Sequence, residues 1–333
     1  MNLGSPDSTK VSDVRSYLRE FLMDERVIDL PYLGRFLLVN GIIAPFRAPK
    51  SAAAYRSIWT KEGSPLVVLT RKLQAAVKAV VPEQVEIAMR YGQPHPKVAY
   101  GNLLQNNPDL EEVTLFPLYP HYAMSSYETA VEYMKKVYRE EGYRFRLKNV
   151  PAYFEHPAYI HALVESIRPY LRQPFDKILF SYHGVPERHI HKGHTAFHPE
   201  LPKNTVCPGD CPVTDYCYRA QVRKTTQLVV DALGIPDGKW EQTFQSRLGR
   251  DPWLQPYTAE RLALLPGEGV KKLLVVSPAF VSDCLETLEE IAVEGKETFL
   301  HAGGQSFEAI PCLNTSENWV NAIAAIKETA VFI

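Results

Sequence analysis

The sequence has no long apolar run, almost no excess of charge and few cysteines. Its 333 residues carry a net charge of -1, which gives no electrostatic reason to expect binding to nucleic acid. No uninterrupted apolar stretch approaches the ~20 residues of a spanning helix, and the first six residues lack the basic and apolar parts of a signal peptide. Five cysteines in so long a chain do not indicate a secreted disulfide framework. We therefore expect a cytoplasmic protein without a transmembrane segment, for which peripheral contact with a membrane is left open.

What is present is the alternation of an α/β protein. A hydrophobic content of 45% and a charged content of 23% are typical of a globular chain, and its length suffices for roughly two domains. Short apolar runs rich in β-branched residues alternate with amphipathic helical patterns, as in βαβ units on a parallel sheet. The predicted strands are residues 85–90, 113–118, 144–150, 177–182, 240–246, 271–277 and 307–311.

The first half holds three of these strands and the second half holds four, so the first half lacks one. Leu3-Gly4-Ser5-Pro6 has the composition of a turn that ends a strand, yet only Met1 and Asn2 precede it. Either the domain tolerates a strand stub or the natural chain begins upstream of Met1. We expect the second, because a parallel sheet that lost a strand would expose backbone ladder groups and apolar helix faces.

A histidine follows directly on one of the most apolar predicted strands. In residues 178–186 (ILFSYHGVP) the strand ends at His183, and Gly184 and Pro186 then turn the chain. The carboxyl ends of parallel strands form the edge at which such sheets bind ligands, and we expect the turn-rich residues 93–105 and 187–203 to form long loops there. Neutral imidazole is both an Fe(II) ligand and a base near neutral pH. The alternative is a histidine that is merely satisfied by a loop carbonyl.

A second strand leads into a helix that carries carboxylates. In residues 273–290 (LLVVSPAFVSDCLETLEE) the acidic residues Asp283, Glu286 and Glu290 recur at i, i+3 and i+7, which predicts one face of a helix. Most acidic rows at a helix start are only solvated and favoured by the dipole. This row gains interest because it follows a strand end, as His183 does, so that both can meet above one edge of the sheet.

A tryptophan stands in a proline-rich loop. Trp253 lies between Pro252 and Pro256 in residues 245–256 (QSRLGRDPWLQP). An exposed and rigidly held indole suits stacking on a flat aromatic ligand. Packing of the indole against its own loop is the alternative.

These three segments together resemble the ferrochelatase family. The resemblance extends in order over nearly the whole chain and includes residues 2–6 (NLGSP), 55–66 (YRSIWTKEGSPL), 88–92 (AMRYG), 117–120 (PLYP) and 311–314 (PCLN). It implies an enzyme of haem biosynthesis that inserts Fe(II) into a porphyrin and releases two protons. It also implies a chelatase-like α/β fold of two similar Rossmann-like halves, residues 1–150 and 151–333. Each half has a parallel four-stranded sheet, the first half with a truncated first strand, and a porphyrin cleft lies between them.

The resemblance also implies roles for single residues. His183 and Glu286 match the catalytic, metal-binding histidine and glutamate of the family, in the second half. Asp283 and Glu290 match an acidic path for protons or metal, and Cys284 stands where the family often has a histidine. The positions that match the family's porphyrin pocket are Leu3, Arg47, Tyr55, Ser64, Arg90, Tyr91 and Trp253.

Three cysteines lie close together, at Cys207, Cys211 and Cys217. Some bacterial ferrochelatases carry a [2Fe–2S] cluster on a similar internal segment, but a cluster takes four thiolates, and Cys312 would have to supply the fourth. A zinc site completed by a residue such as His198, or reduced cysteines without metal, are the alternatives.

Two other functions compete with iron insertion. A related chelatase would load cobalt or nickel into another tetrapyrrole, but Trp253 and the carboxylates from Asp283 to Glu290 favour ferrochelatase. A non-catalytic haem or metal carrier would keep the cleft without needing the base that His183 and Glu286 provide. Protoporphyrin IX and coproporphyrin III both remain as substrates, and the oligomeric state is left open.

Overall fold

The computed structural model describes residues 1–197, 214–247, 249 and 251–333. The chain forms two compact units. Unit 1 comprises Met1–Leu118, Met124–Pro151 and Ile323–Ile333, and unit 2 comprises Tyr119–Ala123 and Ala152–Ala322. Each unit has its own sheet, so each is described by itself.

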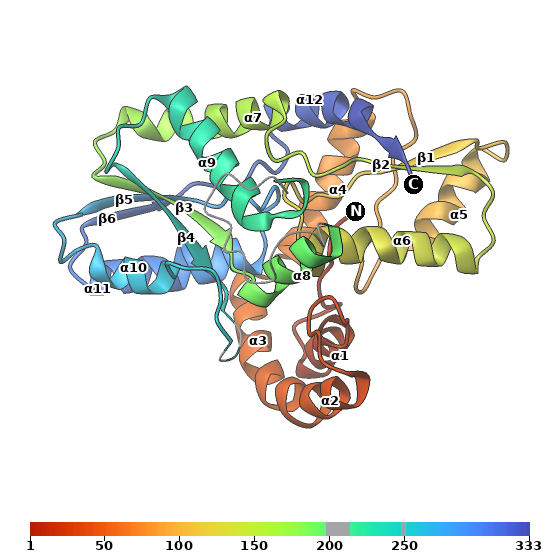
Figure 1. Cartoon of the computed structure of the whole chain (residues 1–333), viewed down its shortest axis with the longest axis horizontal. Coiled ribbons are helices and arrows are strands. Elements are labelled where there is room, and N and C mark those ends of the chain that lie inside the picture. Colours follow the sequence, from red (N-terminus) through yellow and green to blue (C-terminus); the bar gives the residue numbers. More distant parts are fainter. Residues whose placement is uncertain (198–213, 248, 250) are drawn as a thin grey trace. The chain divides into compact units, whose positions relative to one another are not determined.

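Unit 1 combines a small sheet with a group of helices. Figure 1 shows α1, α2 and α3 packed against one another, and α5 and α6 beside β1 and β2. The elements are α1 (Val11–Leu22), α2 (Tyr32–Leu37), the π-helix η1 (Leu38–Ile43), α3 (Ala44–Ile58), α4 (Pro65–Lys78), α5 (Pro96–Asn106), β1 (Glu112–Leu115), the π-helix η2 (Met124–Glu128), α6 (Thr129–Glu140), β2 (Arg146–Asn149), the 3-10 helix η6 (Lys327–Thr329) and β7 (Val331–Phe332). Buried side chains such as Leu115, Met134 and Leu147 join β1, β2, α5 and α6 in one core.

The sheet of unit 1 differs from the predicted four parallel strands. Its order is β1-β2-β7, with β1 and β2 parallel and β7, which was not predicted, antiparallel to β2. Residues 85–90 form no strand: Met89 makes a single parallel bridge with Asn2. On the other side of the first residues, the Leu118 amide donates to the Met1 carbonyl at 2.9 Å. Met1 and Asn2 thus lie between Met89 and Leu118, where the first strand of this half was expected, and Asn2 forms an isolated bridge there.

Unit 2 has the predicted parallel sheet of four strands in the order β4-β3-β5-β6. Its alternation of strands and helices confirms the α/β class, and in Figure 1 α7 and α9 lie on one side of this sheet and α10 and α11 on the other. The elements are α7 (Pro157–Ile167), the 3-10 helix η3 (Arg168–Arg172), β3 (Lys177–His183), α8 (Glu187–Phe197), the 3-10 helix η4 (Thr214–Tyr216), α9 (Tyr218–Leu233), β4 (Trp240–Gln245), α10 (Thr258–Leu264), β5 (Lys272–Val276), the π-helix η5 (Glu286–Gly295), α11 (Lys296–His301) and β6 (Ser306–Ala309). Helix α12 (Glu317–Ile326) spans the division between the units.

Two stretches that we expected to be long loops contain helices instead. Residues 96–106 form α5, and residues 187–197 form α8. Both begin directly after a turn that contains proline, which ends the preceding segment and is tolerated in the first turn of a helix. Among the described residues, no helix is both long and apolar enough to cross a bilayer.

Candidate active site

The central strand of unit 2 carries His183 to the carboxyl edge of the sheet. Residues 178–182 of β3 are buried and His183 is half-buried, so the sequence prediction of its position is confirmed. The Nδ1 atom of His183 lies 2.6 Å from the Gly184 carbonyl oxygen. Because a carbonyl oxygen only accepts, Nδ1 must carry the proton of the neutral ring, which leaves the lone pair on Nε2 for a proton or a metal. The loop carbonyl expected in the alternative interpretation is therefore present, but it occupies only one of the two nitrogens.

Two aromatic rings stand beside this imidazole. The ring centroids of Phe280 and Trp253 lie 6.3 Å and 6.5 Å from that of His183. Trp253 is only 8% exposed, so the expectation of an exposed indole was wrong. The reason is that the loop folds back and pairs with Pro186. A Cβ on Gly184 would lie 3.2 Å from Cε3 of Trp253, so glycine permits this close packing.

The helix after β5 carries two of the predicted carboxylates. It is a π-helix, η5, rather than the expected α-helix, a form that is frequent at functional sites. The buried side chain of Ile291 packs in the core of unit 2 and attaches η5 to it. Burial raises the pKa of the Glu290 carboxyl and the charge of Glu286 raises it further, whereas the hydrogen bonds from Ser246 and a positive charge on His183 act to lower it. Glu290 therefore has the raised pKa of an acid–base group.

The last residue of β4 and the residue after it contact both glutamates, which the sequence did not predict. The amide of Ser246 donates to Glu290 Oε1 at 2.8 Å, and its hydroxyl donates to Oε2 at 2.5 Å. The side-chain amide of Gln245 donates to the Glu286 carbonyl at 3.1 Å. Residue type gave no signal for these contacts, because they depend on the pairing of β4 beside β3.

Asp283 does not share the helix face of the two glutamates. It precedes η5, and its carboxylate accepts from Asn314 Nδ2 at 2.6 Å, Thr287 Oγ1 at 3.0 Å and the Cys312 amide at 3.3 Å. The predicted spacing over one face was wrong for this residue, because the helix starts later and these donors hold its side chain. Asp283 thus fastens the loop before η5 to the segment around Asn314.

The cysteines near this loop have raised pKa values. Burial raises the pKa of Cys284 and of Cys312, and the neighbouring charges of Glu286 and Asp283, respectively, raise them further. Burial also raises the pKa of Cys217, at the start of α9. These surroundings favour the neutral thiol over the thiolate at all three positions.

The other residues of the predicted cysteine site, Cys207, Cys211 and His198, lie outside the described residues. Within the described part of the chain, no group of three or more His, Cys, Asp or Glu side chains could hold a metal ion. Of the four cysteines predicted to hold a cluster, Cys217 and Cys312 are among the described residues, and both are free thiols.

The remaining predicted residues belong to unit 1. Leu3 and Tyr91 lie together, since the Tyr91 amide donates to the Leu3 carbonyl at 2.8 Å. Arg47 is exposed on α3, whereas Tyr55 on the same helix and Ser64 before α4 are buried. Unit 1 thus offers one exposed cation among these positions.

The second predicted cation of unit 1, Arg90, has its charge balanced by a buried carboxylate. Its guanidinium pairs with Asp24, donates to Thr129 Oγ1 at 2.8 Å and lies over the rings of Tyr91 and Tyr133. Burial raises the pKa of Asp24, but the hydrogen bond from Thr129 and the charge of Arg90 together hold this pKa below its usual value. Asp24 was missed by sequence reasoning, because a single carboxylate between two helices carries no pattern.

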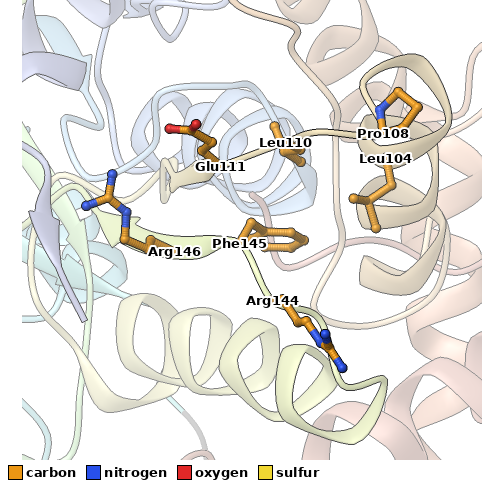
Figure 2. A pocket seen from close by; sticks show the side chains of 7 residues that line it. All are labelled: Leu104, Pro108, Leu110, Glu111, Arg144, Phe145 and Arg146. Atoms are coloured by element: carbon orange, nitrogen blue, oxygen red, sulfur yellow. The ribbon is translucent and has the colours of Figure 1, made fainter.

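An open pocket of about 470 Å³ in unit 1 contains none of the predicted site residues. Figure 2 shows Arg144 and Arg146 on either side of Phe145 in its lining. It lies where β1 and β2 begin, whereas ligands of parallel sheets bind where strands end. The lining residues are Leu104, Pro108, Leu110, Glu111, Arg144, Phe145 and Arg146.

Comparison with known proteins gives matches over the whole chain. A family model described as Ferrochelatase matches residues 1–331. A ferrochelatase of Pseudomonas putida is 49% identical, over 99% of this chain and 98% of the relative, and one of Pseudomonas syringae pv. tomato is 46% identical, over 99% and 96%. Among solved structures, SirB from Bacillus subtilis with Fe3+ matches with a TM-score of 0.53 and 12% identity, over 79% of this chain and 89% of that one. This last likeness concerns the fold alone.

Proposed function

This chain belongs to the ferrochelatase family, and on that premise we propose that it inserts ferrous iron into a porphyrin through His183, Glu286 and Glu290. The observation that carries these assignments is the Nδ1 contact of His183 with the Gly184 carbonyl, which directs a basic Nε2 away from the turn. The same histidine acts electrostatically on Glu290. His183 pairs in register with Gln245 at the end of β4, and Gln245 and Ser246 hold the helix of the two glutamates at this same edge of the sheet.

Metal insertion needs these groups because two pyrrole N–H bonds break and two protons leave, while the iron exchanges its waters for four Fe–N bonds. His183 Nε2 takes a pyrrole proton as general base. Glu286 and Glu290 attract the cation, help it to exchange its waters, and pass protons outward. In this proposal Asp283 fixes the loop at the start of the path, because its own oxygens are occupied by Asn314, Thr287 and Cys312.

We assign to the porphyrin pocket, as direct contacts or as supports, Leu3, Arg47, Tyr55, Ser64, Arg90, Tyr91 and Trp253. Arg47 is exposed and suits a porphyrin carboxylate, because a guanidinium binds carboxylates in a bidentate way. Arg90 acts indirectly, since its charge is balanced by Asp24. The buried Trp253 supports the turn that follows His183.

The direct test is the metallation of a porphyrin, monitored through the change in the absorbance spectrum of the porphyrin. With Fe(II) under anaerobic conditions, or with Zn(II), we expect the spectrum of the free porphyrin to be replaced by that of the metalloporphyrin at an enzyme-dependent rate. Parallel assays with protoporphyrin IX and coproporphyrin III would identify the substrate. Tight porphyrin binding without metallation would instead support a carrier.

A [2Fe–2S] cluster on this chain would take its thiolates from Cys207, Cys211 and Cys217. For the predicted fourth ligand, Cys312, the surroundings favour the neutral thiol, and its backbone amide donates to Asp283. We therefore derive no step of the reaction through a cluster.

We further propose that unit 1 contacts a membrane surface through an apolar arm patch. Between Leu30 and Phe46 the only charged residue is Arg35, which is buried and donates to two backbone carbonyls. Exposed cations follow at Arg47 and Lys50, and an apolar face next to basic residues suits a bilayer with anionic lipids. The apolar arm patch consists of Leu30, Tyr32, Leu33, Phe36, Leu37, Ile42 and Phe46, each at least 43% exposed.

Replacing Leu33 and Leu37 together by glutamate should weaken binding to vesicles of phosphatidylcholine and phosphatidylserine by more than about tenfold, because each leucine loses its apolar transfer energy. Co-sedimentation measures the bound fraction. The matched control is Val98→Glu, which changes an exposed apolar residue of α5. Equal binding of all three proteins, or a concentration-dependent dimer that the double variant abolishes, would contradict the membrane proposal.

A further inference from the structure

Ser246 adopts a backbone conformation that is uncommon for its residue type. Its φ is 68°, in the left-handed region that favours glycine. It directly follows Gln245, the last residue of β4, at the same edge of the sheet as His183, with which Gln245 is paired in register. A side chain held in such a conformation beside a site suggests a function for that side chain.

The hydrogen bonds of Ser246 show what this conformation achieves. Both of its donors, the backbone N–H and the hydroxyl, are directed at the two oxygens of the Glu290 carboxylate, at 2.8 Å and 2.5 Å. Glycine would reach the same backbone angle without strain and would keep the first of these bonds. Serine adds the second bond, so the carboxylate is held at both oxygens.

The neighbouring residue holds the same helix in another way. Gln245 donates to the backbone carbonyl of Glu286 and accepts from the hydroxyl of Ser181 at 2.6 Å. The start of η5 is therefore already attached to β4 by a contact that leaves the carboxylates untouched. The pair of bonds from Ser246 to Glu290 is then not required to dock the helix.

We propose that Ser246 is a positioning residue that fixes the Glu290 carboxylate in the orientation in which it attracts the metal ion on its way to His183 and Glu286. This inference deepens the proposed function and depends on it for the identity of the cation. It assigns to Ser246 no contact with the porphyrin and no proton transfer. Its effect is to keep a carboxylate from rotating, because charge-assisted bonds are the stronger kind of hydrogen bond.

Two variants separate the hydroxyl from the backbone strain. Ser246→Gly removes the hydroxyl and relieves the strain, and Ser246→Ala removes the hydroxyl and keeps the strain. We expect kcat/KM for Zn(II) to fall by about tenfold in both, as for the loss of one bond to a charged group, with the KM for the porphyrin unchanged. Ser306→Ala, at an exposed serine of β6, is the matched control. A Ser246→Gly protein with wild-type kinetics would overturn the proposal and show that only the backbone matters.

A double-mutant comparison tests whether Ser246 acts through Glu290. In a Glu290→Gln background, Ser246→Gly should cause little further loss, because the group that it positions is already absent. A full additional tenfold loss would refute the assignment.

The dissociation constant of Zn(II), measured by competition with a fluorescent chelator, separates this inference from the proposed function. If the wild-type protein metallates no porphyrin but both Ser246→Gly and Glu290→Gln weaken Zn(II) binding, the proposed function fails and the positioning role stands. If the wild-type protein is active and Ser246→Gly alters neither Zn(II) binding nor turnover, the positioning role fails alone.

Discussion

Replacing His183 by alanine should lower kcat for porphyrin metallation by at least about 100-fold, because a positioned general base contributes about 10²–10⁴ in rate. The ring is held by its Nδ1 contact with Gly184, so its loss removes a base whose proton-accepting atom is already oriented. Porphyrin binding should change little, because the other residues assigned to the porphyrin stay in place. Absorbance assays of metalloporphyrin formation give kcat, and quenching of porphyrin fluorescence gives the dissociation constant of the porphyrin.

The control for this variant is His161→Ala, which changes an exposed histidine of α7. It should keep wild-type turnover. Added imidazole should restore part of the activity of His183→Ala, because the lost ring leaves space beside Phe280 and Trp253. Wild-type turnover of His183→Ala would remove the assignment, and loss of both turnover and porphyrin binding would show that the residue serves the pocket rather than the reaction.

The central strands of unit 2 were predictable because each is marked by a continuous run of apolar residues in the sequence. The run of apolar residues before His183 and the run before Ser277 are short and are followed by Gly or Pro, which favours buried strands, and parallel pairing then sets where their ends lie. The position of His183 at the sheet edge therefore followed from the sequence. The same reasoning failed for residues 85–90, since a strand also needs a partner, and among the described residues a single bridge, between Asn2 and Met89, forms there.

The details of the site were less predictable because they depend on tertiary contacts. The spacing from Asp283 to Glu290 fits an α-helix, but Asn314, far along the chain, holds Asp283 outside the helix. The left-handed backbone conformation of Ser246 could not be predicted from the sequence, because glycine, not serine, is the residue that indicates such a conformation. A short antiparallel strand such as β7, with both residues exposed, likewise gives no periodic pattern.

Replacing Glu286 by glutamine should lower kcat/KM for the metal by about 100-fold. The amide keeps the shape of the side chain but removes its negative charge, so it attracts the cation weakly and accepts no proton. The KM for the porphyrin should stay near the wild-type value. The matched control is Glu294→Gln, an exposed position on the same helix η5, which should be as active as the wild type; near-normal metal kinetics for Glu286→Gln would argue against its role.

The pH dependence of Glu286→Gln gives an independent check, because it reports on Glu290. The negative charge of Glu286 is one of the causes that raise the pKa of Glu290, after burial. Removing that charge makes ionisation of Glu290 easier and lowers its pKa, so the ionised carboxylate persists to lower pH. The acidic limb of the residual activity should therefore move to lower pH than in the wild type. A limb that stays in place or moves to higher pH would mean that the two carboxylates do not act as a pair.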